Sequence, residues 1–324
     1  MFRKNCAKAL GVFLTDPGGQ IWHWANLRLA NGHVKSTSML SVDVSNGLRE
    51  ELEDLALKKK ARAIGVALHD LETGFRFSLR GDRWFHAAST IKVAVLLAVF
   101  RAADQGRLRL DDSLHVRNRF FSAADGSIFR VSQDRDATPE LYAAIGRTAK
   151  ISALAHAMIV GSSNLAANLL LDFVGVEYAR TVLREAQVDG VELRRGVEDH
   201  GAHDRAINNE ATADGLLSLL SAIRGDFLTP ESKGEVIRIL LEQRFNSMIP
   251  AGLPAHATVA HKTGEISTAS HDIGIVYLPE REPYITAILT EFDPEREGRR
   301  ETVAAISETI YRSLVQTKPK SNED

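Results

Sequence analysis

The chain has 324 residues, with 40 lysines and arginines against 42 aspartates and glutamates, so its formal net charge is −2. Proteins that bind the phosphate backbone of nucleic acids usually carry a basic excess, and the balanced charge therefore argues against a nucleic-acid partner. With 44% hydrophobic and 25% charged residues, the composition is typical of a soluble globular protein. The single cysteine, Cys6, excludes an internal disulfide and any metal site built from several cysteines. No apolar run approaches the roughly 18 residues that a membrane-spanning helix needs.

Residues 1–45 show no sustained hydrophobic period, and we expect a leader or an unstructured extension there. The chain starts with basic residues, but the apolar stretch that follows at 9–14 is short and contains a glycine. A secretory signal normally has a longer apolar region and a cleavage site with small residues. The start of the chain is therefore a weak match to a signal peptide.

From residue 46 the hydrophobic pattern becomes regular. Leucines near helical spacing predict an amphipathic helix that begins at Ser45 or Asn46. Two short apolar runs around Gly74 predict a β-hairpin. Residues 89–103 lack glycine and proline and are apolar on all sides after Lys92, which predicts a helix buried inside the protein.

The rest of the chain is mostly helical in pattern up to residue 244, and then strands return at 257–292 before a last helix at 301–315. This order predicts an α+β fold, in which both ends of the chain share one sheet that is flanked by helices and interrupted by an all-helical insertion.

These changes of pattern predict the organisation of the domain. We expect one domain at 46–316, in which an α/β lobe comes from 46–88 and 250–316 and a helical lobe from 89–249. A charged tail at 317–324 follows. The seam between two such lobes is the usual place for a ligand.

Ser89 and Lys92 stand at the start of the predicted buried helix. Residues three apart share one helical face, so the hydroxyl and the amine can approach hydrogen-bonding distance. A serine becomes a nucleophile beside a base, and a lysine can be that base when burial and a second cation lower its pKa. The pattern also arises by chance, with the serine as a helix cap and the lysine on a solvated face. The all-apolar run after Lys92 disfavours a solvated face.

A second cluster, Gly-Ser-Ser-Asn at 161–164, lies between two apolar helical stretches. Ser162 and Asn164 would deliver a hydroxyl and an amide into the cleft from the helical lobe. Every residue of the cluster is also a good turn or cap former. Taken alone, the cluster is therefore best explained as a loop followed by a helix cap.

A third cluster, Lys262, Thr263 and Gly264, falls within a strand pattern. A glycine in a strand lets another backbone come close, and an open strand edge can bind a peptide-like substrate. Lys262 would supply the second cation, and Thr263 a hydroxyl for a substrate carboxylate. The alternative is a hairpin turn at Gly264 with an exposed lysine.

The three motifs, SxxK, SxN and KTG, occur in this order within the predicted lobes. In this respect the chain resembles the penicillin-recognising serine enzymes, and most closely the class A β-lactamases. The resemblance covers about residues 46–315 and implies a β-lactamase-like (DD-peptidase) fold with an antiparallel sheet. It also implies that Ser89 is the nucleophile that forms an acyl-enzyme, Lys92 a base and Ser162 the proton shuttle.

The same resemblance assigns the binding residues. Asn164 would bind the side-chain amide of the substrate, and Lys262 and Thr263 its carboxylate. The backbone N–H groups of Ser89 and Glu265 would form the oxyanion hole. No metal and no cofactor is implied. The implied substrate-binding set is Asn164, Lys262, Thr263, Gly264 and Glu265.

Class A enzymes deacylate with a glutamate in a loop that follows the SxN element. Glu198 lies in a loop with glycine and histidine residues, at about the interval after Asn164 that the family uses, and is our candidate general base. The alternative is a solvated loop carboxylate beside Arg195 and Asp199.

The chain departs from the class A pattern in four places. The Leu-Asn pair that follows the family's glutamate is absent, and His200 or His203 would have to take the place of the asparagine that holds the water. The middle residue of SxN is Ser163 instead of aspartate, and His271 stands for the cationic partner often found after the KTG strand. The segment 117–139 lengthens the interval between the first two motifs. We expect these departures to affect lactam turnover more than acylation.

Eleven histidines raise the question of a metal site. Several lie in the second half of the chain, at His200, His203, His256, His261 and His271. The sequence contains no HExxH helix and no HxHxD cluster, so we expect no metal.

Together these observations predict a serine hydrolase that β-lactams acylate at Ser89 and that Glu198 helps to deacylate, as in antibiotic resistance. The alternatives are a D-Ala-D-Ala carboxypeptidase or esterase on the same scaffold, and a penicillin-binding sensor or inert scaffold without catalysis. The expected partner is a small β-lactam or peptidoglycan-like substrate, with no nucleic acid and no membrane span, and the expected state is a monomer. The resemblance implies a periplasmic or secreted protein.

Overall fold

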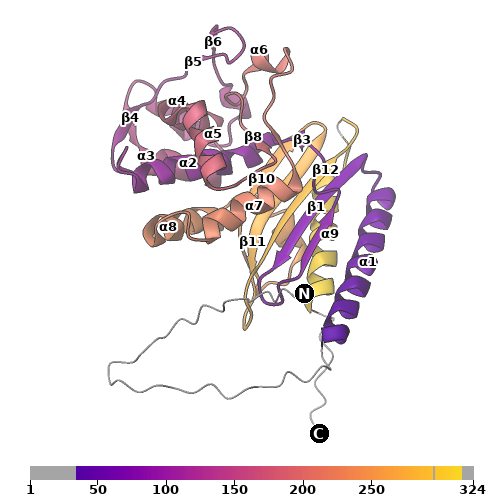
Figure 1. Cartoon of the computed structure of the whole chain (residues 1–324). Helices are drawn as coiled ribbons and strands as arrows, with labels where there is room; N and C mark the ends of the chain where they lie inside the picture. The colour runs from indigo at the N-terminus through magenta and orange to yellow at the C-terminus, as the bar shows by residue number, and fades with distance from the viewer. Residues whose placement is uncertain (1–33, 295, 316–324) are drawn as a thin grey trace, which may run out of the picture. The chain divides into compact units, whose positions relative to one another are not determined.

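The computed structural model describes residues 34–294 and 296–315, with side chains from residue 44 onward. Contacts divide the chain at residue 40, and the fold described here is that of the unit that begins at Ser41. Helix and strands come first, then a block of helices, then three strands and a final helix (Figure 1). This order agrees with the α+β fold expected from the sequence. Cys6, the weak signal-like segment and the tail at 317–324 lie outside the described residues.

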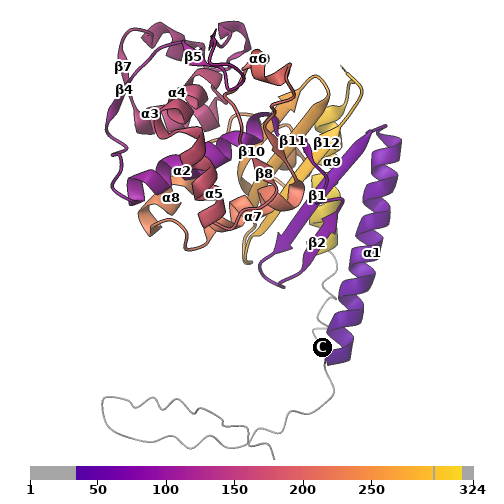
Figure 2. The same ribbon diagram turned by 45° about the horizontal axis from the view of Figure 1, so that its top comes forward.

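A five-stranded antiparallel sheet has the order β10-β11-β12-β1-β2 (Figures 1 and 2). Its strands are β1 (Ala63–Asp70), β2 (Arg76–Leu79), β10 (Thr258–Ile266), β11 (Ala269–Tyr277) and β12 (Tyr284–Glu291). The hairpin predicted around Gly74 is the β1–β2 pair. The pairing of β1 with β12 places Val66 opposite Ile288, so the two ends of the chain share one sheet as predicted.

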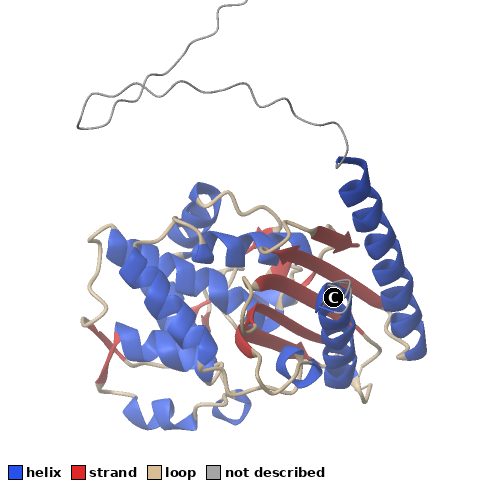
Figure 3. Cartoon of the chain, turned by 90° about the horizontal axis from the view of Figure 1, so that it is seen from below, coloured by secondary structure: helices blue, strands red, loops and turns tan. Residues whose placement is uncertain are grey.

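Helices cover both faces of this sheet (Figure 3). On one face lie α1 (Val34–Lys58) and α9 (Arg299–Val315), and a buried cluster joins Leu52, Val66, Ile288 and Ile306 across this layer. An antiparallel sheet with two buried faces needs strands that are apolar on both sides, rather than alternating ones. The burial of β11 and β12 along nearly their whole length meets this requirement.

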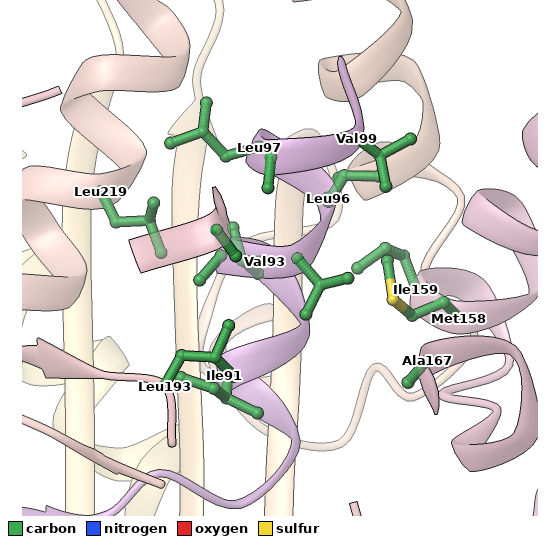
Figure 4. Close-up of a cluster of buried hydrophobic side chains, with 14 of the residues drawn as sticks. Ile91, Val93, Leu96, Leu97, Val99, Met158, Ile159, Ala167, Leu193 and Leu219 are labelled. Carbon is green, nitrogen blue, oxygen red and sulfur yellow. The ribbon is translucent and has the colours of Figure 1, made fainter. Parts of the chain in front are cut away.

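The other face of the sheet adjoins the helical lobe, which is built around α2 (Lys92–Asp104). All residues of α2 from Lys92 to Phe100 are buried, as the apolar pattern predicts. Met158, Ile159 and Ala167 lie on one side of this helix and Leu219 on the other (Figure 4). Burial of a lysine at the first position of such a helix costs free energy unless polar groups form hydrogen bonds with its amino group.

Shorter elements complete the fold. The remaining α-helices are α3 (Ile151–Val160), α4 (Asn164–Val174), α5 (Val176–Glu185), α6 (His200–His203), α7 (Ala213–Arg224) and α8 (Pro230–Leu241). The 3-10 helices are η1 (Ala88–Ile91), η2 (Gln133–Arg135), η3 (Pro139–Ala144) and η4 (Ile249–Gly252). The short strands are β3 (Phe85–His86), β4 (Ser113–His115), β5 (Phe120–Phe121), β6 (Ile128–Phe129), β7 (Thr148–Lys150), β8 (Val191–Glu192) and β9 (Glu210–Ala211). Of these elements, α7 packs directly on β1 and β12.

The predicted start of the first helix is wrong. The sequence predicts that this helix begins at Ser45 or Asn46, whereas α1 begins at Val34. Residues 34–45 contain no glycine or proline, so nothing in this segment stops a helix from continuing toward the N-terminus. No helix in the described part of the chain is both long and apolar enough to cross a membrane.

Candidate active site

Lys92 is a fully buried cation at the start of α2. Its Nζ donates hydrogen bonds to the carbonyl oxygen of Ser162, to Ser162 Oγ at 3.2 Å and to Asn164 Oδ1 at 2.7 Å. Burial and, after it, the nearby charge of Lys262 hold the pKa of Lys92 well below its ordinary value. The chance explanation of SxxK, which needs a lysine on a solvated face, is therefore wrong.

Lys262 approaches the same hydroxyl from β10. Its Nζ donates to Ser162 Oγ at 3.0 Å and to the carbonyl oxygen of Thr263 at 2.8 Å, and its side chain is fully buried. Burial lowers the pKa of Lys262 to about 7, against the opposing charges of Asp272 and Glu265. A hairpin turn at this point with an exposed lysine is thus excluded, because KTG lies inside the paired strand.

Ser89 lies in the first turn of η1 and is half-buried. Backbone N–H groups in the first turn of a helix have no partner within that helix. At Gly264 a Cβ atom would lie 3.0 Å from the backbone nitrogens of both Ser89 and Thr90, so glycine permits β10 to pass close to this turn. An oxyanion hole built from η1 and β10 requires this approach. The backbone N–H of Lys92 donates to the carbonyl oxygen of Ser89, whereas the Nζ of Lys92 bonds to the 162–164 turn.

The 162–164 turn holds Ser162 in the left-handed region, with φ of 54°. This conformation costs an L-residue other than glycine about 1–2 kcal/mol. The next residue, Ser163, caps α4, since its Oγ accepts a hydrogen bond from the Ala166 N–H at 3.2 Å. The cap explanation thus holds for Ser163, while Ser162 and Asn164 face the two lysines.

Glu198 connects to this cluster through Asn164. Its Oε1 accepts a hydrogen bond from Asn164 Nδ2 at 2.7 Å, and its Oε2 accepts one from the Ser132 N–H at 2.9 Å. Asn164 therefore bridges Lys92 and Glu198, using its oxygen for one and its amide nitrogen for the other. The alternative of a free, solvated loop carboxylate is wrong. Its neighbour Asp199 is fully buried and forms separate contacts.

Two asparagines that the sequence analysis missed hold the loop of Glu198. Asn168 is buried; its Oδ1 accepts from the Val197 N–H at 2.7 Å and its Nδ2 donates to the Val197 carbonyl at 2.9 Å. At the loop's base, Asn209 Nδ2 donates to the Arg195 carbonyl at 3.0 Å and its Oδ1 accepts from the Arg195 N–H at 3.1 Å. Asn168 could have been found, because it is a polar residue one helical turn after Asn164 in an apolar helix.

The family model described as "Beta-lactamase enzyme family" matches residues 47–314. The chain belongs to the beta-lactamase enzyme family. The beta-lactamase ROB-1 of Haemophilus influenzae is 28% identical over 273 residues, which cover 82% of this chain and 84% of that protein. A beta-lactamase of Rhodobacter capsulatus is 26% identical over 291 residues, covering 87% of this chain and 93% of that protein.

Solved structures give the same result for the fold. An ancestral class A beta-lactamase superposes with a TM-score of 0.70 at 27% identity, covering 82% of this chain and 99% of that one. PBP-A superposes with a TM-score of 0.71 at 25% identity, covering 83% of this chain and 96% of that one. The class A resemblance and the β-lactamase-like α+β fold inferred from the motifs are thereby confirmed.

His271 does not supply the cationic partner that class A β-lactamases often have after the KTG strand. His271 is fully buried; its Nε2 bonds to the carbonyl of His86 at 2.9 Å, and the Thr290 N–H donates to its Nδ1 at 3.1 Å. Burial lowers the pKa of His271 to about 4, so the side chain is neutral and cannot act as a cationic partner. His200 contacts Glu198 through the backbone, since its N–H donates to the Glu198 carbonyl oxygen at 2.9 Å, and the His203 ring bonds to Asn208 at 2.9 Å.

The other histidines do not gather into a ligand cluster. His261 pairs with Asp272 at 2.9 Å, and His156 pairs with Glu242 at 2.7 Å. Among the described residues there is no group of three or more histidine, cysteine, aspartate and glutamate side chains that could hold a metal ion.

Proposed function

We propose that this chain is a serine β-lactamase that is acylated at Ser89 and deacylated through Glu198. The observation that carries the proposal is the convergence of two buried lysines on one hydroxyl, since Ser162 Oγ lies 3.2 Å from Lys92 Nζ and 3.0 Å from Lys262 Nζ. A proton relay to a leaving nitrogen needs such a hydroxyl between two basic groups.

Acylation begins with neutral Lys92, whose lowered pKa makes the free amine available as a base. The amine removes the proton of Ser89 as its oxygen attacks the lactam carbonyl carbon. The N–H groups of Ser89 and Glu265 stabilise the resulting oxyanion. As the C–N bond breaks, the proton passes from Lys92 through Ser162 Oγ to the lactam nitrogen, while Lys262 holds that hydroxyl in place.

Deacylation uses Glu198, which bonds to the amide nitrogen of Asn164. The carboxylate of Glu198 takes a proton from a water molecule as the water oxygen attacks the ester carbonyl. The ester C–O bond then breaks, and Glu198 gives the proton that it took from water to the departing oxygen of Ser89, which restores the free hydroxyl and the carboxylate. Hydrogen bonds from Asn164 and from the Ser132 N–H orient both carboxylate oxygens of Glu198.

Substrate binding follows the same assignment. Thr263 and Lys262 would receive the lactam carboxylate, and Asn164, with unused hydrogen-bonding capacity on its amide, the side-chain amide of the substrate. Gly264 keeps β10 close enough for Glu265 to contribute its N–H. We further propose that the enzyme acts as a monomer in the periplasm or outside the cell.

The time course of the Ser89 adduct tests the proposal. Mass spectrometry after mixing with benzylpenicillin, a cephalosporin or nitrocefin should show an adduct that forms and decays. Ser89→Ala should form none, and Glu198→Gln should extend the adduct's lifetime about 100-fold or more. The exposed Glu140 offers a matched control, because Glu140→Gln removes the same charge from a solvent-facing side chain.

The alternatives give different results in the same experiment. A long-lived wild-type adduct that Glu198→Gln does not prolong indicates a D-Ala-D-Ala carboxypeptidase or an esterase on this scaffold. The absence of any adduct and of any hydrolysis, with Ser89→Ala unchanged, indicates a scaffold or sensor without catalysis.

A further inference from the structure

A loop that belongs to none of the three sequence motifs lies against the 162–164 turn. This 130–138 loop is part of the segment that the sequence analysis treated only as a longer interval. At Gly161 a Cβ atom would lie 2.2 Å from Thr138 Oγ1, so any larger residue would have to displace the Thr138 side chain or the loop. Asn118 anchors the loop by bonding to both the N–H and the carbonyl of Val131, at 2.9 and 2.8 Å.

The loop inserts one carboxylate, Asp136, which is only 6% exposed. Its Oδ2 accepts hydrogen bonds from Ser163 Oγ and from the Leu165 N–H, both at 2.9 Å. Its Oδ1 accepts one from the Thr138 N–H at 2.9 Å, and the Tyr142 hydroxyl lies 3.3 Å from Oδ2. A buried carboxylate is stable only when donors surround it in this way, and the N-terminus of α4 adds a favourable dipole.

Asp136 thus bonds to the middle residue of the 162–164 turn and to the residue that follows the turn. Ser163 lies between the two residues that bond to Lys92, and Leu165 directly follows the second of them. We propose that Asp136 is a positioning residue, which holds Ser162 in its left-handed conformation and thereby presents Ser162 Oγ and Asn164 Oδ1 to Lys92. The inference rests on the proposed function, because it assigns a role in the acylation of Ser89.

The same loop also touches the deacylating side of the site. The Ser132 N–H donates to Glu198 Oε2 at 2.9 Å, and the Tyr142 hydroxyl lies 3.2 Å from the Ser132 carbonyl as well as near Asp136. Burial and the negative charge of Asp136 raise the pKa of Tyr142, so its hydroxyl stays protonated and remains a donor. One loop thus contacts Glu198 directly and bonds to Ser163 and Leu165, the chain neighbours of Ser162 and Asn164.

Asp136 also influences the pKa of Lys92. The pH dependence of acylation can therefore distinguish the proposed role from a purely structural one, which would leave that pKa unchanged. Burial and the charge of Lys262 on β10 lower the pKa of Lys92, whereas the carboxylates of Asp136 and Glu198 raise it. Removal of the Asp136 charge therefore leaves Lys92 with a still lower pKa. The acidic limb of the acylation rate, which reports protonation of the base, should move to lower pH.

The first test compares Asp136→Asn with Asp134→Asn. Asp134 is an exposed carboxylate in the same loop, so the two substitutions remove the same charge, but only one touches the turn. We expect Asp136→Asn to slow formation of the Ser89 adduct about tenfold or more, with a smaller change in KM, because the relay groups are displaced. Its acidic limb should shift to lower pH, and Asp134→Asn should show neither effect.

A rescue experiment separates positioning from general damage. Ser163→Asp alone places a second carboxylate beside Asp136 and should slow acylation. In the Asp136→Asn background the new aspartate can cap α4 from within the turn, since aspartate is a favoured N-cap residue. If the two substitutions acted independently, their losses in acylation rate would multiply. We expect instead that the double variant acylates faster than either single variant.

Three results would overturn the inference. The first is a wild-type acylation rate and an unshifted pH limb in Asp136→Asn, and the second is a double variant slower than both single variants. If thermal denaturation shows that Asp136→Asn does not fold, Ser163→Ala decides, because it removes one bond to Asp136; a wild-type rate in that variant is the third. A wild-type chain that forms no Ser89 adduct contradicts the proposed function and the inference together, whereas an indifferent Asp136→Asn in an active enzyme contradicts the inference alone.

Discussion

Lys92 and Lys262 donate hydrogen bonds to the same atom, Ser162 Oγ, at 3.2 and 3.0 Å, although they come from a helix of one lobe and a strand of the other. Two buried cations around one hydroxyl disfavour each other's charged state. Burial and the charge of Lys262 lower the pKa of Lys92, which favours its neutral form while Lys262 carries the charge. These two charge states suit the roles proposed for Lys92, as the base that activates Ser89, and for Lys262, as the cation that binds the substrate carboxylate.

The first prediction concerns pH. Because the pKa of Lys262 is about 7, kcat/KM for a lactam with a free carboxylate should fall as pH rises through about 7, where the free enzyme loses this positive charge. Lys262→Arg keeps its charge at higher pH and should remove this decline. The measurement is the pH profile of kcat/KM for wild type and variant. The methyl ester of the same lactam serves as a control and should show no such limb; a flat wild-type profile with the free acid would contradict the prediction.

The sequence predicted those site residues that are marked by short motifs inside regular elements. Lys92, Ser162 and Lys262 could be found because each stands in a short motif, and the structure brings these three side chains together. Asp136 could not be found, because its bond to Ser163 spans 27 residues through a segment without hydrophobic periodicity. Such a contact depends on how two loops pack, which no local pattern records. The start of α1 was missed for a related reason, since its first turns carry few apolar residues.

The second prediction concerns the contact between β10 and η1. A Cβ atom at residue 264 would lie 3.0 Å from the nitrogens of Ser89 and Thr90, so Gly264→Ala must push the strand and the turn apart by a few tenths of an ångström. We expect acylation to slow by about tenfold to a hundredfold, since misplacement of an oxyanion hole weakens it steeply.

Burst kinetics with nitrocefin measure this effect. Gly234→Ala in α8 is the control, because a Cβ atom there meets nothing within 4 Å. That variant should keep its activity and gain up to about 1 kcal/mol of unfolding free energy. Equal acylation rates in the two variants would show that the close approach at Gly264 has no catalytic consequence.

The third prediction concerns the loop of Glu198. Asn168→Leu removes both side-chain bonds to Val197 and leaves its partly buried N–H and carbonyl without these partners. The free energy of unfolding should fall by about 2–4 kcal/mol. The adduct at Ser89 should also live longer, because Val197 directly precedes Glu198. Chemical denaturation and the adduct time course measure the two effects.

Asp172 on the same helix provides the comparison for this prediction. Its carboxylate pairs with Arg117 at the surface, so Asp172→Asn should cost less than about 1 kcal/mol and leave the adduct lifetime unchanged. An Asn168→Leu variant that is destabilised but deacylates normally would separate the stability of this loop from its function.

The last prediction concerns substrate charge. Glu265 lies two residues after Thr263 on β10, so the two side chains share a face of the strand, and Arg300 binds the Glu265 carboxylate with Nε at 2.9 and 3.0 Å. This pairing neutralises an arginine beside the residue assigned to the lactam carboxylate. In Glu265→Gln the guanidinium becomes unpaired, and KM for a lactam with a free carboxylate should fall about two- to fivefold with little change in kcat. The gain should shrink at high salt, because the Arg300 side chain is 55% exposed, and it should disappear in the double variant with Arg300→Ala. Steady-state kinetics at two ionic strengths distinguish these outcomes. An unchanged or higher KM in Glu265→Gln would mean that Arg300 does not act on the substrate.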